Sequence, residues 1–100
     1  MTIQIQDSGD TITLKVDGEI DHVGAESLKG SFNQLSLLGK STVVFDFKNV
    51  TYVGSAGLGK LLLFYKRLSA QNIKLRVQSP SQTVRELLKE LKMDTLFAVS

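Results

Sequence analysis

Apolar and polar residues alternate in three short stretches of the chain, which is the pattern of a β-strand with one buried face. The first two stretches, residues 2–6 and 11–17, flank the turn-forming residues 7–10 and predict an antiparallel hairpin. Residues 73–78 alternate in the same way and predict a later strand. A near-continuous apolar run between Thr42 and Phe47 predicts a central strand that is covered on both faces and ends near Asp46.

Three other stretches carry apolar residues at helical spacing. Asp21 is the predicted N-cap of the first helix, after a strand that ends at Gly18, and Gly39 follows its last turn. The second helix is expected to run from about Ser55 to Ala70. A third is expected to begin at Ser79, with Pro80 at its first position and Gln82 completing a capping box. The apolar stripes of the three helices are Ala25, Leu28, Phe32, Leu35 and Leu38; Leu58, Leu61, Leu62, Tyr65 and Leu68; and Val84, Leu87, Leu88 and Leu91.

The order of these elements predicts one α/β domain that spans residues 1–100. The strand–helix–strand unit from Val43 to Val77 is expected to be a parallel crossover, so the sheet is mixed, with four or five strands and three or more helices. Residues 93–99 are expected to form a short edge strand or an extended tail.

Glycines crowd the junction between the central strand and the second helix. Gly54, Gly57 and Gly59 surround Ser55, which stands where the first helical turn begins. The spacing fits neither a phosphate-binding P-loop nor the Gly-x-Ser-x-Gly turn of the hydrolases. Ser55 either caps the helix or presents a hydroxyl at the sheet edge, in the positive end of the helix dipole. Asp21 follows the neighbouring strand and is expected at the same edge, as a cap or as a partner of the serine.

Composition narrows the possible chemistry. The chain has no cysteine and a single histidine, His22, which leaves no thiolate metal site and argues against a His-rich metal centre or a serine–histidine triad. The net charge of +2 is too small to indicate nucleic-acid binding. No stretch reaches the roughly 20 apolar residues of a membrane span, and the N-terminus lacks the pattern of a signal peptide. We therefore expect a cytoplasmic protein without a cofactor, and not an enzyme.

Two motifs resemble those of a known family. Residues 52–59 read Tyr-Val-Gly-Ser-Ala-Gly-Leu-Gly, and Asp-Gly-Glu-Ile-Asp at residues 17–21 precedes a helix that contains Ala-Glu-Ser-Leu at residues 25–28. Their order and separation resemble the STAS domain of bacterial anti-sigma factor antagonists over nearly the whole chain. One position differs, because Gly54 stands where that family carries an aspartate.

The resemblance implies a STAS fold and a partner-switching role in transcription. In such a system the unphosphorylated protein binds an anti-sigma factor, which is also a serine kinase that binds ATP or ADP, and this frees a sigma factor. The kinase phosphorylates the serine that matches Ser55, the antagonist is released, and a PP2C-type phosphatase restores it. A monomer or a weak dimer is expected.

The partner-binding surface is expected around the phosphorylated serine. Leu63 or Phe64 is expected to be exposed there, because four consecutive apolar residues on a helix cannot all face one core; burial against the third helix is the alternative. Lys60 is expected either on this surface or on an ordinary solvated face. The predicted binding residues are Asp21, His22, Gly54, Ser55, Ala56, Gly57, Leu58, Lys60 and Phe64.

Two alternatives remain open at the level of the sequence. Without an aspartate at Gly54, the chain is also compatible with a constitutive interaction module in a larger signalling or lipid-transport assembly. A hydrolase with Ser55 as its nucleophile is the other alternative, but no base is evident to activate the hydroxyl.

Overall fold

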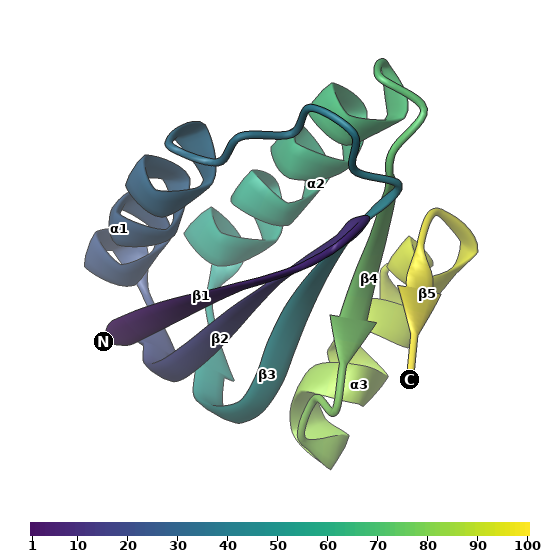
Figure 1. The fold of residues 1–100 in the computed structure, drawn as a ribbon. Helices are drawn as coiled ribbons and strands as arrows, with labels where there is room; N and C mark the ends of the chain where they lie inside the picture. The colour runs from purple at the N-terminus through teal and green to yellow at the C-terminus, as the bar shows by residue number, and fades with distance from the viewer.

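The computed structural model describes all residues from Met1 to Ser100 and forms one sheet with helices against it (Figure 1). The prediction of an α/β domain is confirmed. In chain order the elements are β1 (Thr2–Ser8), β2 (Thr11–Ile20), α1 (His22–Asn33), β3 (Thr42–Val53), α2 (Ser55–Ser69), β4 (Lys74–Gln78), α3 (Gln82–Glu90), the short 3₁₀ helix η1 (Met93–Thr95) and β5 (Ala98–Val99).

The five strands follow their chain order across the sheet, from β1 at one edge to β5 at the other. β1 pairs with β2 in an antiparallel hairpin, and β2, β3, β4 and β5 run parallel. The mixed sheet, the hairpin, the crossover and the short last strand are confirmed. Because β2 and β3 are parallel and Ile20 lies beside Val53, the chain leaves both strands at the same end of the sheet.

One face of the sheet carries the core. Strand neighbours such as Ile12 and Val43, or Leu14 and Phe45, point to the same side and belong to a single cluster of 22 buried residues. All three helices contribute to this cluster, which joins Phe32, Phe45 and Phe64. The ring of Phe64 stacks on Phe32 with 4.2 Å between centroids and on Phe45 with 5.6 Å. Figure 1 shows α1 and α2 on this side of the sheet.

The opposite face of the sheet has no helix over it. The expectation that β3 is covered on both faces is wrong, because the helices pack on the core face only. Val44 points to the other face and lies outside the core cluster, although its neighbours leave it only 6 % exposed. It lies between Thr13 of β2 and Arg76 of β4, whose side chains point to this open face with it. A valine on the solvent side made the strand read as continuously apolar.

Three element boundaries of the first half of the chain differ from the prediction. Helix α1 ends at Asn33, and Leu38, expected on its apolar face, is 93 % exposed in the connection to β3. Gly39 therefore serves that connection, with φ of +77°, and not the helix end. Strand β3 continues past Asp46 because it pairs with β2 as far as Val53, and β2 likewise passes Gly18. The Asp46 carboxylate accepts a hydrogen bond from the Lys48 N–H at 3.0 Å, beside the point where the register with β2 shifts.

The start of α3 also differs. Ser79 has φ of +54°, whereas an N-cap residue has an extended backbone, so Ser79 cannot cap the helix. Ser81 takes that place, and its hydroxyl accepts a hydrogen bond from the Val84 N–H at 3.2 Å.

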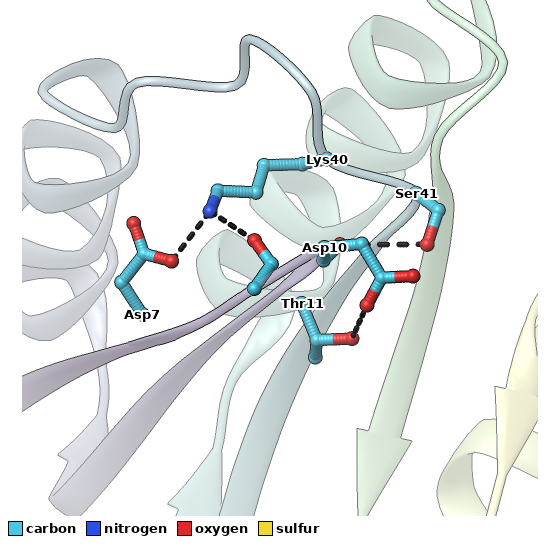
Figure 2. A network of polar contacts seen from close by, with 6 residues as sticks. Asp7, Asp10, Thr11, Lys40 and Ser41 are labelled. Atoms are coloured by element: carbon cyan, nitrogen blue, oxygen red, sulfur yellow. Dashed lines mark hydrogen bonds and ion pairs between the residues drawn. The ribbon is translucent and has the colours of Figure 1, made fainter.

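A polar network closes the amino ends of the parallel strands (Figure 2). The Lys40 ammonium bridges the Asp7 carboxylate and the Gly9 carbonyl, and its side chain is only 11 % exposed. The Ser41 N–H donates to the Asp10 carbonyl at 2.7 Å. The connection that follows α1 is thereby fastened to the β1–β2 turn, at the end of the sheet opposite Ser55.

Candidate functional site

The site is built where β2 and β3 end side by side. The Gly54 N–H donates a hydrogen bond of 3.0 Å to the Ile20 carbonyl. From this point β2 leads into helix α1, and β3 leads into helix α2. Asp21 and Ser55 follow these two residues directly, so the structure brings them to the same edge of the sheet, as the sequence predicted.

Asp21 performs the capping role expected for it. One oxygen of its carboxylate accepts a hydrogen bond from the Gly24 N–H at 2.8 Å at the start of α1. Gly24 is needed there, since a Cβ atom would lie 2.4 Å from the Glu19 carbonyl oxygen. The Asp21 side chain is nevertheless exposed, and its other oxygen has no partner within the protein, so the carboxylate can both cap the helix and face a binding partner.

Ser55 does not cap its helix. Gly54 is the N-cap of α2, with an extended backbone and no side chain to bond the first turn, and Ser55 is the first helical residue. The Ser55 side chain is exposed, and its hydroxyl takes part in none of the side-chain hydrogen bonds of the structure. Its hydroxyl therefore lies free at the positive end of the helix dipole.

Tyr52 begins the motif at residues 52–59 but was not among the predicted binding residues, and the structure places it at the site. A Cβ atom on Gly54 would lie 3.0 Å from the Tyr52 hydroxyl oxygen and 3.3 Å from its ring, so the phenol lies over the glycine. Tyr52 is 52 % exposed, beside Ser55. The available signal was strand parity: Tyr52 precedes the core residue Val53 and so points away from the core.

Gly57 has a packing role. It is buried, and a Cβ atom there would lie 2.6 Å from the Ile20 Cγ2 and 3.1 Å from the Val53 Cγ1. The first turn of α2 can approach the ends of β2 and β3 only because this side chain is absent. The structure thus gives Gly57 a place inside the junction and not on a contact surface, while Leu58 is half-buried against the core.

A shallow groove of about 300 Å³ runs between α1 and α2 next to Ser55. Lys60 approaches Glu26 across it, with 3.6 Å between the ammonium nitrogen and a carboxylate oxygen. The groove brings together three residues of the predicted binding set, His22, Ala56 and Lys60, with three that were not predicted. It also contains Leu63, which the sequence predicted as one of two alternatives for exposure there. Its lining is His22, Ala25, Glu26, Ala56, Gly59, Lys60 and Leu63.

Phe64 is not part of this surface. Its side chain is fully buried, and the prediction that it contacts a partner is wrong. Consecutive residues of the apolar run on α2 point in different directions around the helix: Phe64 faces the core, Leu63 lines the groove and Leu62 is 37 % exposed. Periodicity alone could not choose which of the neighbours turns inward.

The polar groups of the site remain separate from one another. No hydrogen bond joins Ser55 to His22 or Asp21, and nowhere does the structure gather three His, Cys, Asp or Glu side chains in a group that could hold a metal ion. None of its helices has the length and apolarity needed to cross a bilayer. The arrangement offers an exposed hydroxyl, a carboxylate and a groove, which suits contact with another macromolecule.

Comparison with known proteins agrees with this arrangement. A STAS-domain containing protein of Pseudomonas aeruginosa is 26 % identical over 92 residues, which cover 92 % of this chain and 90 % of that protein. The anti-sigma-F factor antagonist RsfB of Mycobacterium tuberculosis is 25 % identical over 97 residues, covering 97 % of this chain and 79 % of that protein.

The fold is shared with solved structures as well. The Bacillus cell fate determinant SpoIIAA in its phosphorylated form superposes with a TM-score of 0.77 at 19 % identity, over 99 % of this chain and 91 % of SpoIIAA. At that identity the likeness concerns the fold alone. The family model of the STAS domain matches residues 2–100. The chain therefore belongs to the STAS domain family.

Proposed function

We propose that this chain is an anti-sigma factor antagonist whose binding is switched by phosphorylation at Ser55. The unphosphorylated form binds an anti-sigma factor with serine kinase activity and frees the sigma factor. The kinase transfers a phosphoryl group from ATP to Ser55, which releases the antagonist, and a PP2C-type phosphatase removes it. The relative named anti-sigma-F factor antagonist supports the partner class.

The observation that carries the proposal is the free hydroxyl of Ser55. It is exposed, it is not used as a helix cap, and it lies beside a groove. A side chain that the fold does not use can be modified without loss of the fold. The start of α2 also has no side-chain cap, so a phosphate there would meet unpaired backbone N–H groups and the positive end of the dipole.

A phosphate would act on the complex and not on the domain. It adds a charge of about −1.5 to −2, and an interface formed by the unmodified serine would have to desolvate that charge. Removing a partner from most of the population takes a few kcal/mol of differential binding, which the burial of this charge against a partner without a matching cation supplies. Lys60, the cation of α2 that lines the groove, already approaches Glu26 and is therefore not a free partner for the phosphate.

The contact surface in this proposal consists of side chains on both sides of the groove. Asp21 and His22 contribute from the start of α1, and Ser55, Ala56 and Lys60 from the first turns of α2. Gly54 contributes backbone only, and the half-buried Leu58 contributes its exposed part.

The decisive experiment measures modification and binding together. Intact-mass analysis of the protein from its native cells, with mapping of the peptide that contains Ser55, should detect one phosphate on this residue. Ser55→Ala is then used to capture the kinase, and the binding of Ser55→Asp to that kinase should be at least about tenfold weaker, the equivalent of about 1.4 kcal/mol.

A matched control is available on the same helix. Ser69 is exposed at the far end of α2, and Ser69→Asp should bind the kinase as the unchanged protein does. Full binding by a sample that is stoichiometrically phosphorylated at Ser55 would refute the switch.

A second candidate function is favoured by the Tyr52–Gly54 contact. The phenol occupies the space of a side chain at position 54, so this surface presents an aromatic group and no carboxylate beside Ser55. A constitutive module in a larger signalling or lipid-transport complex would need no modification there. Stable partners that co-purify under every growth condition, without phosphate on Ser55 and with Ser55→Ala fully functional, would favour this candidate.

A further inference from the structure

The two edges of the sheet differ in how much unpaired backbone they present. At one edge, β5 has two residues, Ala98 and Val99. At the other edge, β1 has seven residues, and no strand pairs with its outer side. Every second residue of β1 therefore directs its N–H and C=O groups to solvent, which is a template for another strand.

β1 also lacks the features that keep an edge strand from pairing. It contains no proline and no lysine, and it pairs with β2 residue for residue from Thr2 to Ser8 without a bulge. Its first charged residue is Asp7, near the end of the strand. Ile5 is 48 % exposed, although it points to the same side of the sheet as the core residue Leu14.

We propose that β1 is a self-association surface, which pairs antiparallel with β1 of a second copy of this chain about a two-fold axis at Gln4. The occupant is indicated by the symmetry of the strand itself. Residues 2–6 read Thr-Ile-Gln-Ile-Gln, so this register sets Gln4 against Gln4 and each Ile3 against an Ile5. No charges of like sign meet within the five pairs.

The register also matches the faces of the sheet. Ile3 and Ile5 lie beside Val16 and Leu14 of β2 and thus point to the core side, where the opposed isoleucines of the two copies would cover each other. Gln4 lies beside Lys15 on the open face. The product is one continuous sheet of twice five strands, in which both edges are now the two-residue β5.

The pairing leaves the candidate functional site accessible. Antiparallel association about Gln4 turns the second copy end over end, so the two Ser55 residues lie at opposite ends of the joined sheet. A dimer of this kind presents two separate binding sites, and the proposal does not depend on the role of Ser55.

Cysteine cross-linking tests the register directly, because the chain has no cysteine of its own. Gln4→Cys places two sulfurs across the axis, where opposed Cα atoms are about 4.5–5.5 Å apart, within the range that a disulfide spans. Gln6→Cys is the matched control: in this register residue 6 opposes residue 2, so the two substituted positions of that variant are separated by four residues along the strands, about 13 Å. Gln4→Cys should give a disulfide dimer under mild oxidation and Gln6→Cys should not. Cross-linking of both variants, or of neither, would overturn the proposal.

A charge variant tests the pairing without a covalent bond. Gln4→Glu sets two carboxylates against each other across the axis, while within one copy the new carboxylate lies beside Lys15. Sedimentation of the unchanged protein, from micromolar concentrations up to about 1 mM, should show a mass that rises from 11.0 kDa toward twice that value. The dissociation constant of the Gln4→Glu dimer should be about fivefold higher than that of the unchanged protein, because like charges directly opposite each other are destabilising. The thermal stability of the monomer should not change. A protein that stays monomeric throughout, or a Gln4→Glu variant that associates equally well, contradicts the proposal.

Discussion

The two ends of the parallel strands are both polar, but they use their polar groups differently. At the amino end, the Lys40 ammonium donates to the Asp7 carboxylate and the Gly9 carbonyl, and the Ser41 N–H donates to the Asp10 carbonyl (Figure 2). At the carboxyl end, the Ser55 hydroxyl has no partner and α2 begins without a side-chain cap. Groups that are paired internally stabilise the fold, whereas unpaired exposed groups are available to a partner. The comparison separates residues that hold the domain together from residues that it presents.

The largest effect on stability is expected at the carboxyl end of the parallel strands, where Gly57 is packed inside the junction. Gly57→Ala should lower the free energy of unfolding by about 1–3 kcal/mol, because its Cβ would meet Ile20 at 2.6 Å. Gly59→Ala, two residues further along α2 with no atom within 4 Å of its Cβ, should be neutral or stabilising by up to about 1 kcal/mol. Urea denaturation measures both, and equal effects would contradict this assignment of Gly57.

At the amino end, we expect Lys40→Met to lower the free energy of unfolding by about 1–2 kcal/mol. The ammonium is lost from two acceptors while the aliphatic part of the side chain is kept. Lys66→Met, on the exposed side of α2 and without an ion pair, is the control and should stay within about 0.5 kcal/mol. Binding of the kinase should not change with Lys40→Met. A binding defect in a folded Lys40→Met protein would show that the two ends are not separate.

Asp21 belongs to both categories, so two substitutions are needed to divide its roles. Asp21→Ala should cost about 1 kcal/mol through loss of the cap on α1. Asp21→Asn retains an acceptor for the Gly24 N–H and should keep most of that stability. If the carboxylate also contacts the partner, Asp21→Asn should weaken binding in a stable protein. Calorimetric unfolding measures the stability of both variants, and binding titrations measure their affinity for the partner. If both substitutions destabilise the protein equally, capping is ruled out as the structural role of Asp21.

The smallest effect on stability is expected at Ser55 itself. Ser55→Ala should change the free energy of unfolding by less than about 0.5 kcal/mol, because the hydroxyl bonds to nothing in the protein. Ser81→Ala is the matched comparison at the start of α3, where the hydroxyl does cap the helix, and it should cost about 1 kcal/mol. Thermal unfolding compares the two serines. If Ser55→Ala is as destabilised as Ser81→Ala, the Ser55 hydroxyl has a structural role and is not free for a partner.

Much of the fold could be predicted because local patterns and tertiary packing agree. The alternation at Ile12 and Leu14 required a strand with one buried face, and Asp21 had the chemistry of a cap at the start of an apolar stripe. The exposure of Ser55 could be predicted because a glycine-rich turn between a strand and a helix exposes whatever polar residue it carries. Each of these patterns involves residues that are close together in the sequence, so it predicts the same local structure whatever the rest of the fold is.

The errors lie where distant segments decided the outcome. Leu38 is at helical spacing, but Lys40 and Ser41 fasten the connection to the β1–β2 turn and α1 stops at Asn33. Ser79 and Ser81 are both capping residues by type, and the backbone of Ser79 is left-handed after β4. Phe64 fills the space between Phe32 and Phe45, two residues far away in the chain.

The sequence by itself determined that this chain forms an α/β domain with a serine at a glycine-rich helix start, since these properties follow from periodicity and residue type. The tertiary structure alone decided which side chains around that serine are presented. Tyr52 over Gly54, Gly57 against Ile20 and Glu26 across the groove from Lys60 all join different turns or elements. The physical reason is that burial and contact depend on which segments pack together, and spacing along one segment carries no information about its neighbours in space.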